Sequence, residues 1–452
     1  MDENNLSKFL ELMSKSDLSH SDLDLINLGK SLALDLVLFA DLRASQEENF
    51  ANIIRQKALK KMEIDKDNYL TSEDVFYAGS VDFMVCEEPN GKKFFLLETN
   101  GGSNRGLSII TEKQQSIMYD GYFEAIEQAI KKNKCSNDNK IVILVGVPIN
   151  DSLIHEKIIM IEYLRNKIKQ RHLSVEIYNI NTFRSNFNTD IAFLIADYKE
   201  LSTSLSFSDN WIKFNKTSKV NVLIGDGIAR RFQNHKFKKL IRENFRNINT
   251  IIVNPIFLVT DDKSLTYLAS FYAKNRLEKY NLKYLLFTKA YEENELIEKL
   301  GKIIKEHKKP FIIKPDGGSG GAGVIPIGPD EDLSNIKNLI EESKKEFFAK
   351  FMKNRNPYPY TIQEMAKFST IKWRGGLHTF DVRLYLAQRK GVVIPIGGLA
   401  RIARGAYKGT LNKQEFVVNL SGFNGVIEVE RGCGISERNA KLLNLTIDDF
   451  VN

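Results

Sequence analysis

A lysine followed by a run of glycines is the feature of this sequence best suited to chemistry. Residues 311–324 read FIIKPDGGSGGAGV, so an apolar run ends on Lys314 and five glycines follow within the next nine residues. Backbone N–H groups without a neighbouring Cβ atom let phosphate oxygens approach closely, and a lysine adds positive charge for the same oxygens. The stretch therefore predicts a phosphate-binding loop, with a plain flexible loop as the alternative.

The flanking pattern decides among the known phosphate-binding loops. A P-loop places its lysine after the glycines, whereas Lys314 comes before them. Gly318, Gly320 and Gly323 match the spacing of a dinucleotide fingerprint, but the following VIPIG reads as a strand and not a helix. Protein kinases also close a flap over ATP, but the chain contains neither HRD nor DFG. We therefore expect a strand–loop–strand flap of another nucleotide-binding class.

Further motifs lie on both sides of the expected flap: VTDDK at 259–263, YTIQEM at 360–365, DVRLY at 381–385 and GGLARIAR at 397–404. Together they resemble the ATP-grasp superfamily. In that superfamily a segment similar to VTDDK begins a helix whose lysine reaches the phosphates, and one similar to YTIQEM meets the adenine. The resemblance implies a nucleotide site made of Lys263, Lys314, Gly317, Gly318, Ser319, Gly320, Gly321, Gln363, Glu364 and Met365.

Two arginines, Arg383 and Arg401, stand within otherwise apolar strand-like runs. A buried charge without a partner is unfavourable, so each arginine is expected to face a bound anion or an internal salt bridge, for example with Asp381. The resemblance implies that both arginines are catalytic together with Lys314, with Arg401 stabilising the transferred phosphoryl group or an oxyanion. For Lys263, a surface ion pair is the alternative.

Candidate magnesium ligands occur near the N-terminus, in VDFMVCEEPNGKKFFLLETN at 81–100. Glu98 and Asn100 are two apart in an expected strand and share a face, and both offer the hard oxygens that magnesium prefers. Asp82 lies on the preceding strand. It shares that face if the connection has three residues, 89–91, or a bulge, whereas a two-residue turn puts it on the other face. A hairpin whose carboxylates pair with its own lysines is the alternative.

The motif order, with the metal hairpin early and the nucleotide lysines late, resembles the circularly permuted ATP-grasp proteins of the glutathionylspermidine synthetase type. The resemblance implies ATP and Mg²⁺ as cofactors and a carboxylate–amine ligase that forms an amide through an acyl phosphate. A phosphotransferase or synthase using the same cleft, or a non-catalytic nucleotide-binding protein, is the alternative. The metal ligands implied are Asp82, Glu98 and Asn100, and the substrate residues implied are Asn104, Arg105 and Asn419.

The rest of the pattern predicts the elements that must position these residues. Apolar spacing predicts helices in the first 70 residues and at 111–131, 262–280 and 292–307, with strands at 75–85 and 93–98 and in FVVNLSG at 416–422. Strands alternating with helices predict a parallel sheet with Rossmann-like connections in the middle of the chain. We therefore expect a permuted ATP-grasp fold of α/β and α+β class. Its parts are the N-terminal helices with the metal hairpin (1–135), a Rossmann-like pre-ATP-grasp domain (136–256) and the ATP-binding subdomains (257–452).

Composition bounds the remaining possibilities. The 452 residues are 42% hydrophobic and 27% charged, as is usual for a soluble globular protein. The net charge is +8, but the sequence has no basic stripe interleaved with aromatic residues, which argues against a nucleic-acid-binding surface. The polar start MDENNLSKFLELM and the lack of a run of about 18 apolar residues favour a cytoplasmic protein without a membrane span. Three scattered cysteines predict neither disulfides nor zinc. The expected partners are a small carboxylate substrate and an amine substrate, drawn from amino acids, peptides and polyamines. Homodimers are common in the superfamily, so a homodimer is one possible oligomeric state.

Overall fold

The computed structural model describes residues 39–64, 75–101, 107–133, 140–147, 154–225, 247–255, 263–316, 321–351, 356–420 and 427–452. Contacts between Cα atoms divide the chain into two compact units, which we describe separately. The first unit contains Met1–Ser80, Asn100–Val259 and Tyr385–Gly397, and the second contains Val81–Thr99, Thr260–Leu384 and Gly398–Asn452. The division predicted at residues 135 and 256 stays a prediction.

The first unit is built on a five-stranded parallel sheet of order β10-β9-β3-β5-β4. Every residue of β3 and β5 is buried, as expected for parallel strands covered on both faces. The predicted parallel α/β sheet is therefore confirmed. Its strands are β3 (Ile141–Val147), β4 (Val175–Asn179), β5 (Ile191–Asp197), β9 (Val222–Ile224) and β10 (Ile251–Ile252).

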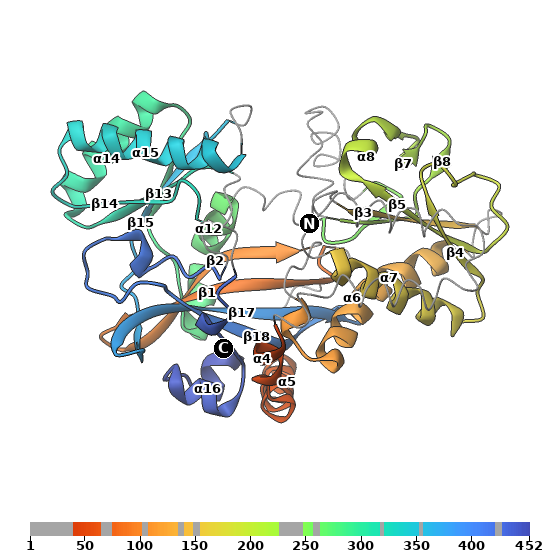
Figure 1. Ribbon diagram of the computed structural model, residues 1–452, viewed down its shortest axis with the longest axis horizontal. Coiled ribbons are helices and arrows are strands. Elements are labelled where there is room, and N and C mark those ends of the chain that lie inside the picture. Colours follow the sequence, from red (N-terminus) through yellow and green to blue (C-terminus); the bar gives the residue numbers. More distant parts are fainter. Residues whose placement is uncertain are drawn as a thin grey trace. The chain divides into compact units, whose positions relative to one another are not determined.

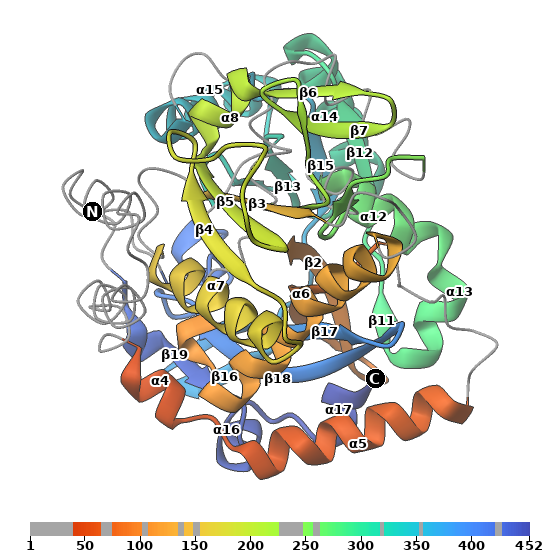
Figure 2. The same cartoon turned by 90° about the vertical axis from the view of Figure 1, so that its right-hand side faces the viewer.

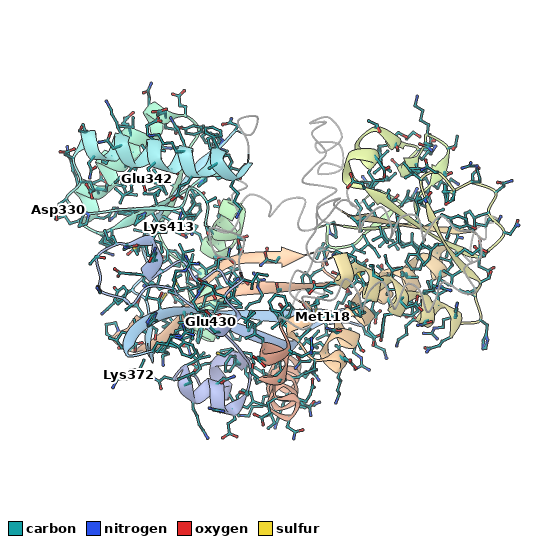
Figure 3. The ribbon with its side chains drawn as sticks, viewed as in Figure 1. Met118, Asp330, Glu342, Lys372, Lys413 and Glu430 are labelled. Carbon is teal, nitrogen blue, oxygen red and sulfur yellow. The ribbon has the colours of Figure 1, made fainter. Side chains whose placement is uncertain are left out.

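Two long helices, α6 and α7, pack side by side in this unit (Figures 1 and 2). Met118 of α6, labelled in Figure 3, is fully buried in a cluster that also contains Ile143 of β3 and Leu164 of α7. The other elements are a small antiparallel sheet and short helices. The bounds are α4 (Ala40–Ala44), α5 (Glu48–Ile64), η2 (Leu107–Ile109), α6 (Glu112–Asn133), α7 (Ile154–Lys169), α8 (Tyr198–Ser204), β6 (Leu205–Ser208), β7 (Trp211–Phe214) and β8 (Ser218–Lys219).

The second unit contains a four-stranded sheet of order β12-β15-β13-β14, covered by α14 and α15 (Figure 1). Its apolar core includes Ile313, Ile340 and Ile362, all fully buried. β13 and β14 pair antiparallel, with Phe311 opposite Ile327, so the two predicted strands that flank the glycines are confirmed, and their role as a nucleotide flap stays a prediction. The bounds are β12 (Phe287–Ala290), α14 (Glu293–His307), β13 (Phe311–Lys314), β14 (Ile325–Ile327), α15 (Leu333–Phe351) and β15 (Tyr360–Glu364).

Helical structure in 263–280 is broken, although the sequence predicts one helix over 262–280. α12 (Lys263–Tyr272) is followed by α13 (Lys274–Leu277) and η3 (Glu278–Tyr280), because Ala273 leaves the helical region with φ −88° and ψ 4°. The predicted strand at 416–422 is also wrong for residues 416–420, which form no regular structure. The remaining elements of this unit are β11 (Leu282–Lys283), β16 (Thr370–Trp373), η4 (Lys413–Glu415), η5 (Val429–Arg431), β19 (Gly432–Gly434), α16 (Glu437–Leu442) and α17 (Ile447–Val451).

Four long strands contain residues of both units: β1 (Ala78–Glu88), β2 (Gly91–Gly101), β17 (Gly376–Arg389) and β18 (Val392–Ile402). They belong to a sheet of order β11-β2-β1-β17-β18-β19, with β16 paired to β17. β1 and β2 therefore form the predicted hairpin next to the strands that carry Arg383 and Arg401. Polar residues on these four strands are the main candidates for a functional site.

The connection between β1 and β2 has two residues, Pro89 and Asn90, because Gly91 already begins β2. In a two-residue hairpin Glu88 is opposite Gly91, so Asp82 lies opposite Leu97 and on the other face from Glu98. The apolar core agrees, since residues of even number on β1 cluster with residues of odd number on β2, as Cys86 does with Phe95. The odd-length connection required by the three-ligand metal prediction is therefore wrong.

Candidate functional site

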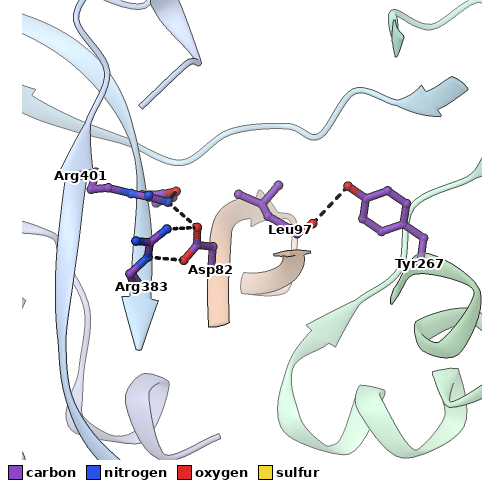
Figure 4. Close-up of polar contacts among 6 residues, drawn as sticks. Asp82, Leu97, Tyr267, Arg383 and Arg401 are labelled. Carbon is purple, nitrogen blue, oxygen red and sulfur yellow. Dashed lines mark hydrogen bonds and ion pairs between the residues drawn. The ribbon is translucent and has the colours of Figure 1, made fainter. Parts of the chain in front are cut away.

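A hydrogen-bond chain joins the lysine before the glycines to the N-terminal hairpin. Lys314 Nζ lies 2.6 Å from Gln363 Oε1 and donates to the Tyr267 hydroxyl at 3.0 Å. Tyr267 in turn donates to the backbone carbonyl of Leu97 at 3.1 Å (Figure 4). The residue after Leu97 is Glu98, whose charge acts on the Tyr267 hydroxyl. Residues near both ends of the sequence therefore meet within the second unit.

Gln363 is the most unusual member of this chain. It lies on β15, where register pairs it with Ile312, so it is diagonal to Lys314 on the same face. Its side chain is 1% exposed, and its Nε2 has no hydrogen-bond partner among the described residues. A buried amide donor without an acceptor is unfavourable by about 1–3 kcal/mol. An acceptor supplied by a ligand is a simple way to satisfy it.

Tyr267 was not predicted from the sequence. It lies on α12 four residues after Lys263, the first residue of that helix, so one helical turn separates them. Burial, helped by Glu98, raises the pKa of Tyr267, so the hydroxyl stays protonated and donates. Its ring stacks on Phe95 at 5.7 Å, and Lys314 Nζ lies 5.1 Å from the ring centroid. The spacing to Lys263 was the only signal in the sequence that could have indicated it.

The C-terminal end of the glycine-rich loop is anchored to α15. Gly321 and Gly323 both have positive φ, +75° and +73°, where glycine is favoured. A Cβ atom at Gly323 would lie 2.9 Å from the backbone oxygen of Ser343. The Gly323 N–H donates to Glu346 Oε2 at 3.0 Å, and the Ser343 hydroxyl donates to the Gly323 carbonyl at 2.5 Å. Four residues of the predicted phosphate loop lie outside the described residues: Gly317, Gly318, Ser319 and Gly320.

Both predicted arginines belong to a buried array of four charged residues (Figure 4). Arg383 donates to the two oxygens of Asp82 at 2.7 and 2.8 Å. Arg401 donates to Asp82 at 2.8 Å and to Asp381 through Nε at 2.9 Å and again through Nη2. Asp82, Asp381 and Arg401 are at most 7% exposed. The internal salt bridge that the sequence left open is therefore present.

The two carboxylates of this array differ in electrostatics. Burial alone would raise the pKa of Asp82, but Arg383 and Arg401 outweigh it and hold that pKa below its usual value. Asp381 contacts one arginine only, so burial dominates and raises its pKa to about 6. Burial would lower the pKa of Arg401, but the two aspartates raise it. Arg401 is consequently held as a cation, and Asp381 is protonated more easily than Asp82.

The predicted metal ligands are not brought together as expected. The oxygens of Asp82 are occupied by arginines, and Asp82 lies on the other face of the hairpin from Glu98. Asn100 keeps a buried Nδ2 without a hydrogen-bond partner in the described part of the chain. Over the same residues, no three His, Cys, Asp or Glu side chains gather closely enough to hold a metal ion. Glu98 and Asn100 alone retain the arrangement expected of a ligand pair, two residues apart on β2.

The other predicted site residues have varied surroundings. Glu364 forms an ion pair with Lys309 at 2.8 Å, and Met365 packs against a second apolar cluster that contains Tyr267. The backbone carbonyl of Asn419 accepts a hydrogen bond from Arg431 at 2.6 Å. Lys263 begins α12, and Asn104 and Arg105 lie outside the described residues. The roles predicted for these residues stay predictions.

Comparisons with known proteins assign no family. No family model matches the chain, and no curated protein is similar to it in sequence. Among solved structures, it resembles a glutathione synthetase-like effector from Globodera pallida at 12% identity and a TM-score of 0.37, over 82% of this chain and 84% of that one. A putative γ-glutamylcysteine synthetase from Methylobacillus flagellatus has 13% identity and a TM-score of 0.41, over 90% and 96%.

D-alanyl-alanine synthetase A from Vibrio cholerae has 9% identity and a TM-score of 0.35, over 68% of this chain and 78% of that one. Because all three TM-scores lie below 0.5, these likenesses support no argument about family or activity. The chain is therefore described by its own geometry: a mixed α/β protein with several sheets, whose second unit contains a buried array of charged residues. No helix among the described residues is long and apolar enough to cross a membrane.

Proposed function

We propose that the protein is an ATP-dependent carboxylate–amine ligase that forms an amide bond and releases ADP and phosphate. The observation that carries the proposal is the hydrogen-bond chain from Leu97 through Tyr267 to Lys314 and Gln363. It supports a single site in which the N-terminal hairpin and the flap act on one ligand. A fixed ammonium, a buried amide donor and a glycine-rich loop are together suited to a polyphosphate nucleotide.

In this proposal Lys314 binds phosphate oxygens, and Gln363 uses its unpartnered Nε2 to bind an acceptor on the nucleotide. Lys263, one helical turn before Tyr267, adds a second positive charge, and Glu364 and Met365 continue the strand edge that meets the base. Gly317, Gly318, Ser319, Gly320 and Gly321 bind phosphate oxygens in this proposal. Bound ATP supplies the phosphoryl group that activates the substrate carboxylate as an acyl phosphate.

The charged array fits a role in orienting cations. Arg401 and Arg383 stabilise the negative charge that develops on the transferred group, and Asp82 and Asp381 hold the two guanidinium groups in place. Mg²⁺ would be held by Glu98 and Asn100, because Asp82 already accepts three hydrogen bonds from arginines. Asn100 would contribute its amide oxygen, which is a hard ligand. Asn104, Arg105 and Asn419 remain the proposed contacts to substrate.

The test uses the full-length protein with Mg-ATP and a panel of amino acids, short peptides and polyamines. ADP release and the mass of the product are measured for each carboxylate–amine pair. The expected result is ADP and phosphate together with a condensed product of the two substrates. A stable phosphorylated product would instead identify a phosphotransferase, and ATP binding without turnover would identify a nucleotide-binding protein.

Lys314→Ala is expected to lower kcat/KM about 100-fold or more, because a phosphate-binding charge in a partly buried site is lost. The matched control is Lys305→Ala on the exposed face of α14, which removes the same charge elsewhere in the unit and leaves turnover unchanged. Equal turnover in the two variants would remove Lys314 from the mechanism. ATP binding by calorimetry separates lost binding from lost chemistry.

A further inference from the structure

A cavity of about 390 Å³ opens in the first unit, and none of its lining residues belongs to the proposed ligase site. α6, α7 and the end of β17 line it, and α6 contributes one face of its helix at Ile117, Asp120, Glu124 and Glu127. Phe123 adds an apolar wall. The volume lies in the range of about 300–1,000 Å³ that small-molecule sites occupy.

Four charged residues of the lining are already paired. Lys167 Nζ lies 3.0 Å from Asp120 Oδ1, and Asp120 also accepts a hydrogen bond from Tyr163 at 2.7 Å. Arg171 forms an ion pair with Glu127. These two pairs join α6 to α7 and neutralise one another, so they define the walls of the cavity and leave no net charge.

Four polar residues of the lining remain, of which Gln170 is exposed to solvent. Glu124 of α6 and Arg389 at the end of β17 form no ion pair within the ranges that the structure describes. Gln388, beside Arg389, is 3% exposed, and its Oε1 has no hydrogen-bond partner in those ranges. A buried acceptor left unpaired is unfavourable by about 1–3 kcal/mol, so the cavity retains one anion, one cation and one unsatisfied acceptor.

We propose that this cavity binds a small zwitterion of the α-amino acid class. The ligand ammonium would donate to the Glu124 carboxylate and to Gln388 Oε1, and the ligand carboxylate would accept from the Arg389 guanidinium. A zwitterion matches this set because it satisfies an anion, a cation and a hydrogen-bond acceptor without leaving an unpaired charge. The side chain of the ligand would lie against Phe123 and Ile117. The inference is independent of the proposed ligase function.

Calorimetric titration of the full-length protein without ATP tests the inference. The probes are L-leucine, L-lysine and L-glutamate, and the expected result is a Kd of about 1 mM or tighter for at least one of them. The N-acetyl and amide derivatives of that amino acid each lose one charge and are expected to bind at least about tenfold more weakly. Absence of binding by all three amino acids, or equal binding of the blocked derivatives, overturns the proposal.

Two variants locate the site. Arg389→Gln and Glu124→Gln are each expected to raise the Kd about tenfold or more, since each removes one of the two charged contacts. Lys132→Gln and Glu112→Gln are the matched controls, because both lie on α6, are exposed and do not line the cavity. Weakened binding in only one of the two cavity variants would identify a site for a simple ion and overturn the zwitterion. Circular dichroism verifies that every variant is folded.

Discussion

The parallel sheet of the first unit and two long strands with residues of both units, β17 and β18, differ in the side chains that they bury. β3 and β5 bury almost only apolar side chains, and Asp197 at the end of β5 is their one ionisable residue. β17 and β18 are only partly buried, and their buried or half-buried residues include Asp381, Arg383 and Arg401. Apolar burial stabilises a sheet wherever it occurs, whereas buried charge is tolerated only in a balanced array. We therefore interpret the apolar residues of β3 and β5 as packing residues, and the charged residues of β17 and β18 as residues of the proposed active site.

The largest expected effect comes from unbalancing the array. Arg401→Met leaves Asp381 buried without a cation and takes one of three arginine hydrogen bonds from Asp82. We expect the free energy of unfolding to fall by about 3–5 kcal/mol, measured by urea unfolding at pH 7.5.

The double variant Arg401→Met, Asp381→Leu is its control. It replaces an ion pair by apolar side chains and leaves Asp82 paired with Arg383, so we expect it to be more stable than Arg401→Met alone. A double variant as unstable as the sum of its parts would show that packing, and not uncompensated charge, causes the loss.

The second test concerns the backbone conformation at Gly323, which an L-residue would adopt only with strain. An alanine there has a positive φ and places Cβ 2.8 Å from Pro315 Cγ and 2.9 Å from the Ser343 oxygen. We expect Gly323→Ala to lower the free energy of unfolding by about 2 kcal/mol. Gly375→Ala has a similar φ, +80°, but no atom within 4 Å of its Cβ, so it measures the conformational effect alone. An equal loss of unfolding free energy in the two variants would mean that Ser343 moves away from the added Cβ atom at no measurable cost.

The third test concerns Glu415, a buried carboxylate held by hydrogen bonds and not by an ion pair. Its oxygens accept from the backbone N–H groups of Lys408 and Gly409, both at 2.9 Å, and from the Thr410 hydroxyl. Burial would raise the pKa of Glu415, but these hydrogen bonds outweigh it and lower that pKa. The ionised form is therefore the one that stabilises the fold.

Glu415→Gln is expected to lower the free energy of unfolding by about 1.5 kcal/mol at pH 7, since the backbone donors of Lys408 and Gly409 lose a charged acceptor. The stabilisation by Glu415 is fully present above the pKa of the unfolded state, about 4.3, and is lost as pH falls through the lowered pKa of the folded state. The difference between wild type and variant should therefore shrink below about pH 4. A difference that grows at low pH would contradict the assignment.

Sequence patterns predicted local structure far better than they predicted contacts between distant residues. The runs IVILVGV and FIIK form buried strands as expected, because their apolar character alone specifies burial. The faces of the metal hairpin were predicted wrongly because they depend on whether one residue, Gly91, belongs to the turn or to the strand. Asp381 was predicted only as a possible salt-bridge partner of an arginine, and Tyr267 was not predicted as a member of the site, since it acts through partners far away in the chain. Such contacts depend on tertiary structure that no local pattern encodes.

The smallest expected effect lies in the first unit and sets the reference for the others. Ile195 of β5 is fully buried among apolar neighbours, and Ile195→Val removes one methylene group without changing charge or backbone conformation. We expect the free energy of unfolding to fall by about 1 kcal/mol, by the same amount at pH 7 and at pH 4, since no titratable group is involved. Hydrogen exchange of the peptide that contains β5 measures the loss locally. A pH-dependent loss would mean that Asp197, two residues later, is coupled to packing of the sheet, and the contrast between an apolar sheet and a charged one would then be less complete.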